Sequence, residues 1–83
     1  MWIRTKDNVP TDGNPVLVTF VNRKPPYYWE HIKDKPFVSV AMYNGDWYWW
    51  DLHNDCVDEK VFTDMIEITA WMPMPSPYKE DEE

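Results

Sequence analysis

Short apolar runs of strand length alternate along the chain with segments rich in turn-forming residues. The run VLVTFV at residues 16–21 follows the turn-rich segment PTDGNP at residues 10–15. Its length and its β-branched residues favour a buried strand over a helix. The alternating run at residues 66–72 predicts a last strand, which should end at Pro73 because proline cannot donate to a sheet ladder.

The dipeptide Asn44-Gly45 lies between two further alternating runs, residues 37–43 and 46–51, and predicts a β-hairpin. Asn-Gly supplies the two positive φ angles of a type I′ turn, whose twist matches that of the flanking strands. With these two residues as the loop, Tyr43 would pair with Asp46. Alternation then gives one face, the expected core face, made of Val38, Val40, Met42, Trp47 and Trp49. The opposite face, where we expect any partner surface of the sheet, would hold Phe37, Ser39, Ala41, Tyr43, Tyr48 and Trp50.

A long loop bracketed by prolines is predicted at residues 23–36, with room for one helical turn. Loops of this length are uncommon in compact domains and often carry function. Three adjacent aromatic residues in it, Tyr27, Tyr28 and Trp29, are therefore candidates for partner contact. The alternative is that they lie back over the sheet as additional core, which so small a domain needs.

Residues 53–64 carry the signals of a short helix. Asp55 would cap it, and Val57, Val61 and Met65 then recur at helical spacing. The expected fold class is mainly β, or small α+β if this helix forms. It is a compact antiparallel sheet of about four strands with one Asn-Gly hairpin, one long loop and at most one short helix.

Length and composition limit the chain to one small domain. Its 83 residues are 43% apolar and 17% aromatic, so the core must come from a few large side chains. We expect a single globular domain at residues 1–77. Residues 78–83 should form an acidic, disordered tail, because the charge run that begins at Lys79 has nothing apolar to bury.

The net charge of −7 is unevenly distributed. Residues 1–35 carry six Lys and Arg against four Asp and Glu, or +2, while residues 36–83 carry two against eleven, or −9. An acidic half repels phosphates, which argues against a nucleic-acid partner and permits a basic protein partner. The alternative is that the charge only keeps a Trp-rich domain soluble.

Cysteine content and hydropathy bear on where the protein works. Cys56 is the single cysteine, so no intramolecular disulfide can form, which favours a reducing compartment. The start, MWIRTKDNVP, lacks the apolar run of a signal peptide, and no stretch has the length of a membrane span. We expect a cytoplasmic protein that does not associate with membranes.

No grouping of reactive side chains matches a catalytic or metal-binding pattern. A structural zinc site needs four ligands, and His53 with Cys56 supplies one pair only. The acidic stretch that begins at Asp51 lacks the glycine of a calcium loop at its sixth position, where Cys56 stands. Nothing brings Cys56 next to a histidine that could act as its base, whether His31 or His53. We expect no enzyme activity, no metal and no cofactor.

The two ends of the chain carry a family resemblance. Trp2-Ile3, Val9-Pro10, Gly13 and the closing segment TAWMPMPSP at residues 69–77 resemble the domain-of-unknown-function 551 family, whose members are short phage and prophage proteins. Ala70 departs from the pattern, because the family commonly has His there, and the loop at residues 23–36 is longer than usual. The resemblance implies a compact β-rich domain of phage or mobile-element origin in a bacterial host, and it implies no activity. We expect the two ends to pack together as structural elements.

These observations favour a non-enzymatic, phage-type accessory protein that binds or inhibits a host protein, including a role against host defence. Trp and Tyr are favoured at interface hot spots. The candidate partner-binding residues are Tyr27, Tyr28, Trp29, Tyr43, Tyr48, Trp50 and Asp51. The alternative is a small-ligand or carbohydrate-binding domain whose exposed aromatic strip (Tyr43, Tyr48, Trp50) stacks on the ligand. A further possibility is a homo-oligomer formed through an uncovered sheet edge.

Overall fold

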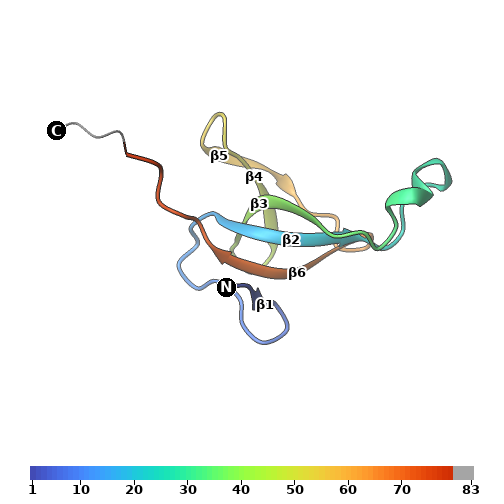
Figure 1. Cartoon of the computed structure of the whole chain (residues 1–83), viewed down its shortest axis with the longest axis horizontal. Helices are drawn as coiled ribbons and strands as arrows, with labels where there is room; N and C mark the ends of the chain where they lie inside the picture. The colour runs from blue at the N-terminus through green and yellow to red at the C-terminus, as the bar shows by residue number, and fades with distance from the viewer. Residues whose placement is uncertain (80–83) are drawn as a thin grey trace.

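The computed structural model describes residues 1–79, which form one antiparallel sheet of six strands. The mainly β fold class is confirmed, although the sheet has six strands rather than about four (Figure 1). The strand order is β1-β6-β2-β3-β4-β5. The elements are β1 (Ile3–Arg4), β2 (Val16–Asn22), the 3-10 segment η1 (Tyr27–Ile32), β3 (Phe37–Tyr43), β4 (Trp47–Asp51), β5 (Cys56–Lys60) and β6 (Ile66–Pro73).

Strand β2 lies at the centre of the sheet, between β3 and β6. Val18 is opposite Ser39 on one side and opposite Trp71 on the other, and it is fully buried. A strand paired on both sides has its backbone polar groups satisfied and needs apolar side chains, as the run at residues 16–21 predicts. The predicted strands at residues 16–21 and 66–72 each agree with the structure to within one residue.

The two ends of the chain pack together as expected. Strand β1 pairs with β6, with Ile3 opposite Trp71. The hydroxyl of Thr5 donates to the carbonyl of Ile68 at 2.7 Å, and the Trp71 indole Nε1 donates to the carbonyl of Asn8 at 3.0 Å. These bonds join residues more than 60 positions apart in sequence, so they fasten the N-terminal segment to the last strand.

The β3–β4 hairpin forms, but its predicted loop and register are wrong. Tyr43 pairs with Trp47, so three residues, 44–46, lie in the loop instead of two. Gly45 has φ +82, whereas Asn44 is not among the residues with positive φ that a type I′ turn would require. The N–H of Asn44 instead donates to the carbonyl of Asp46 at 2.9 Å. Adding one loop residue turns β4 over relative to β3, because side chains alternate with a period of two.

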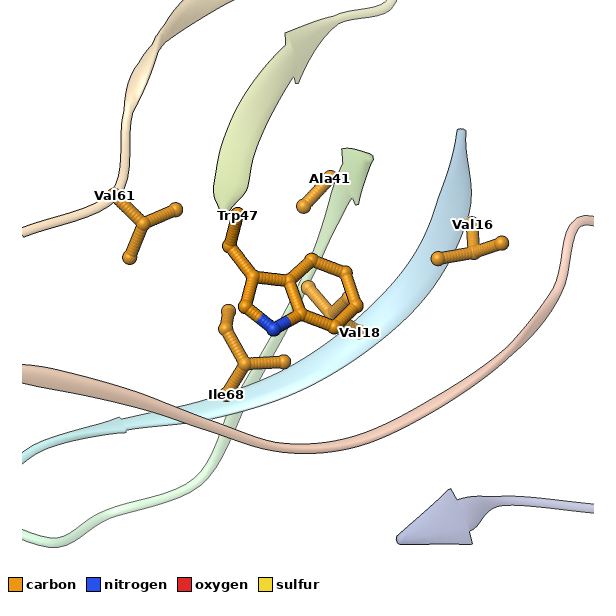
Figure 2. Packing of buried hydrophobic residues seen from close by; sticks show 6 residues of the cluster. All are labelled: Val16, Val18, Ala41, Trp47, Val61 and Ile68. Carbon is orange, nitrogen blue, oxygen red and sulfur yellow. The ribbon is translucent and has the colours of Figure 1, made fainter. Parts of the chain in front are cut away.

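The main buried cluster lies on the face of β3 that contains Ala41 rather than on the predicted core face, of whose β3 residues Val40 alone is buried. Ala41 is fully buried, whereas Val38 is 61% exposed. For β4 the prediction was correct, since Trp47 is buried and Trp49 packs against the core. Figure 2 shows the Trp47 indole among the other residues of the buried cluster, which are Val16, Val18, Ala41, Val61 and Ile68. Tyr43 packs against this cluster, so one face of the hairpin carries Tyr43, the buried Trp47 and the partly buried Trp49.

Residues 56–60 form strand β5 instead of the predicted helix. Asp55 precedes it with φ 55, the left-handed backbone conformation of a turn, and does not cap a helix. Val57 lies opposite Trp50, and the N–H of Val61 donates to the carbonyl of Trp47 at 3.0 Å. The helical spacing is misleading because three apolar positions are too few to separate a helix from a strand that a neighbour can pair. Within residues 1–79, no helix is long and apolar enough to cross a membrane.

Candidate functional site

The segment at residues 23–36, which we call the arm, extends beyond the ends of β2 and β3 (Figure 1, green). Its central part is η1, so the expected loop with one helical turn is confirmed. Pro26 precedes η1, and its carbonyl accepts from the N–H of Trp29 at 2.8 Å. At the other end, the N–H of Lys33 donates to the carbonyl of Glu30 at 3.1 Å. These short-range bonds give the arm a defined local conformation without any contribution from the core.

A charged cluster at the base of the arm holds it to the sheet. The Arg23 guanidinium contacts Glu67 of β6 at 2.8 Å. It also contacts Asp34, near the C-terminal end of the arm segment, at 3.0 Å. The hydrogen bonds that Arg23 donates to Glu67, and to a lesser extent to Asp34, raise the pKa of Arg23 above its ordinary value. Asp34 has φ 60, and its N–H donates to the carbonyl of Asn22 at 2.9 Å. The sequence contained no pattern that predicts this cluster, because its members are 11 and 44 residues apart.

The three aromatic side chains of the arm are exposed and contact one another. Tyr27 is 87% exposed, Tyr28 65% and Trp29 49%, and no residue of η1 is buried. The Tyr27 and Tyr28 rings meet edge to face with centroids 5.2 Å apart, and Trp29 packs against His31 at 5.5 Å. They do not lie back over the sheet as additional core, so that alternative is wrong. Exposed aromatic side chains that gather in one patch are typical of contact surfaces.

Positive charge is concentrated on the same segment. The arm holds four Lys and Arg against two Asp and Glu, a net charge of +2. All other residues together carry −9, which gives the chain its net charge of −7. Among the ion pairs of residues 1–79, none involves Lys24, Lys33 or Lys35. The excess of positive charge in the first half of the sequence comes from the arm, because residues 1–22 carry two Lys and Arg against two Asp and Glu.

The other predicted aromatic residues do not form one strip. Tyr43 lies on the core face, where its ring is 5.1 Å from that of Trp47. Tyr48 and Trp50 alternate with Trp47 and Trp49 along β4 and therefore lie on the opposite face. All three are partly buried. A flat ligand cannot stack on Tyr43 and Trp50 together, so this geometry does not support the carbohydrate-binding alternative.

Asp51 is engaged in the turn between β4 and β5. Its carboxylate accepts from the Asn54 side-chain amide at 2.9 Å, and also from the backbone N–H groups of Asn54 at 3.2 Å and His53 at 2.9 Å. These bonds, chiefly the one from the Asn54 side chain, lower the pKa of Asp51 below its ordinary value. The carboxylate therefore shapes the turn that directs the polypeptide into β5.

Strand β5 forms an acidic edge of the sheet. All five of its residues are exposed, and no strand lies beyond it in the sheet order. Lys60 pairs with Asp46 at 3.4 Å, whereas Asp58 and Glu59 have no ion pair within residues 1–79. Cys56 is an exposed free thiol, and no three His, Cys, Asp or Glu side chains of the described chain come together as metal ligands would.

Comparison with known proteins supports the resemblance seen at the two ends of the chain. The model of a family described as a protein of unknown function, DUF551, matches residues 1–79. The chain belongs to the DUF551 family. No curated protein and no solved structure matches it. The most distinctive feature on the surface of this DUF551 chain is the arm, which combines exposed aromatic side chains with a charge of +2.

Proposed function

We propose that this DUF551 protein is a non-enzymatic, phage-type accessory module that binds a host protein through its arm in the cytoplasm of a bacterium. The observation that carries the proposal is the exposure of Tyr27, Tyr28 and Trp29 on a segment that adds nothing to the core. Tyr and Trp dominate interface hot spots because they bury a large area with few rotatable bonds. Inhibition of a host defence protein is one form that this function would take.

The construction of the arm suits binding. The ion pairs of Arg23 fix its two ends, and the bond between Trp29 and Pro26 fixes its fold, so less conformational freedom is lost on association. A buried Tyr or Trp contributes about 150–250 Å². Three partly exposed ones therefore supply roughly half of the ~800 Å² that one partner contributes to a standard interface. The neighbouring lysines would form the polar rim around this aromatic centre.

Capture of a host protein tests the proposal. The tagged protein and the variant Tyr27→Ala/Tyr28→Ala/Trp29→Ala are incubated with host lysate at low and moderate salt. Phe62→Ala/Tyr78→Ala is the matched control, because it also removes large exposed side chains but lies outside the arm. We expect the original protein and the control to capture the same host protein, and the arm variant to lose it. Capture of no protein in repeated trials, or equal capture by the arm variant, would overturn the proposal.

A further inference from the structure

A second charged surface lies on β4, β5 and the turn between them. We call residues 46–60 the acidic hairpin, because they carry five Asp and Glu against one Lys, or −4. It also exposes two apolar side chains, Leu52 at 58% and Val57 at 45%. This combination of free carboxylates with exposed apolar area complements the arm, which combines free lysines with exposed aromatic rings.

The arm and the acidic hairpin cannot meet within one molecule. The arm leaves the sheet from one end of β2 and β3, and the turn of the acidic hairpin lies on another side of the sheet (Figure 1). The Arg23 ion pairs at the base hold the arm in this direction. Two complementary surfaces that are fixed apart in one copy can be joined only by a second copy.

We propose that the protein self-associates, with the arm of one copy docked on the acidic hairpin of another. Lys33 and Lys35 would face Asp58 and Glu59, and the aromatic rings of the arm would cover Leu52 and Val57. Because β5 is an edge strand, the outward carbonyl groups of its backbone would also accept from the Tyr hydroxyls and the Trp29 indole N–H. The proposal goes beyond the proposed function, since it requires no host protein.

The balance of charges predicts weak association. Each copy carries −7, so two copies repel one another in general while the arm and the acidic hairpin attract locally. A small contact of this kind corresponds to a dissociation constant of roughly 0.1–1 mM. Added salt screens the repulsion and the attraction alike, so salt dependence alone does not identify the contact. Exchanging charges between the arm and the acidic hairpin does identify the contact.

Sedimentation equilibrium of the purified protein up to about 1 mM tests the proposal. Lys33→Glu/Lys35→Glu changes the net charge from −7 to −11, since each substitution subtracts two units. The control Lys6→Glu/Lys79→Glu also reaches −11 but leaves both surfaces unchanged. We expect the arm variant to raise the dissociation constant about tenfold or more, and the control to raise it much less.

The reverse exchange completes the test. Asp58→Lys/Glu59→Lys brings the net charge to −3, since each substitution adds two units; this lowers the general repulsion, yet we expect it to weaken association as well. Combining all four substitutions restores −7 and should restore association. A monomer at every concentration, equal weakening by the two −11 variants, or no recovery in the combined variant would overturn the proposal. These measurements use one purified protein, so their failure leaves the capture of a host protein by the arm unaffected.

Discussion

Replacing Trp47 and Trp29 with alanine in separate variants tests the central distinction between core and arm. Both changes remove the same indole, so they differ only in the surroundings that each side chain loses. Trp47 is 8% exposed and packs in the core cluster, whereas the Trp29 ring contacts only the Tyr28 and His31 rings among the aromatic side chains around it. The comparison therefore measures burial rather than side-chain size.

The two variants are expected to lose very different amounts of folding free energy. Truncating a buried Trp to Ala costs about 3–5 kcal/mol, because the cavity that remains only partly collapses. A chain of this length has a total stability of roughly 4–12 kcal/mol at the usual ~0.05–0.15 kcal/mol per residue. Trp47→Ala should thus remove a large share of the stability and lower Tm by roughly 12–40 °C. Trp29→Ala should change stability by no more than about 0.5 kcal/mol, as a surface substitution does.

Thermal and urea unfolding followed by far-UV circular dichroism measure both effects. This signal comes chiefly from the backbone, and the unfolding midpoint does not depend on how much amplitude the removed indole contributed. Trp47→Phe serves as a control that keeps an aromatic ring in the core and should lose less stability than Trp47→Ala. Equal unfolding midpoints for Trp47→Ala and Trp29→Ala, or a larger loss for Trp29→Ala, would refute the assignment of core and arm.

Three further predictions concern the hairpin and the turn that follows it. Ala41→Leu should destabilise the protein by about 1–3 kcal/mol through overpacking, whereas Val38→Ala should cost less than ~0.5 kcal/mol. Urea unfolding measures both losses of stability. A larger loss for Val38→Ala than for Ala41→Leu would instead support the face assignment that follows from a two-residue loop. Gly45→Ala should cost about 1 kcal/mol, because φ is +82 there, and an unchanged Tm would contradict this. The folded-state pKa of Asp51 lies below its ordinary value, so its contribution to stability is complete above the ordinary pKa and is lost as the pH falls through the folded value. Asp51→Asn should remove that part of the acid dependence in melts between about pH 2 and pH 6, and identical pH profiles would contradict the assignment.

The sequence by itself determined those features that depend on near neighbours. Strands β2, β3, β4 and β6 follow from alternation and β-branched residues, and prolines mark both the arm and the end of the last strand. The signatures at the two ends identified the family. The aromatic residues of the arm were also candidates from the sequence, because a long bracketed loop is recognisable without knowing what it packs against.

Tertiary structure decided the features that depend on distant partners. A change of one residue in the loop after Tyr43 exchanges the two faces of a strand. The arrangement that places Trp47 and Trp49 on the same face as Ala41 depends on packing against residues of β2 and β6 as well as on the turn. Residues 56–60 became a strand because β4 offered them a pairing partner. Whether Tyr27 and its neighbours were core or surface depended on the direction of the arm, which Arg23 fixes through two carboxylates far apart in sequence. Local pattern does not encode such long-range competition, because its outcome depends on which arrangement of the whole chain buries the most apolar area.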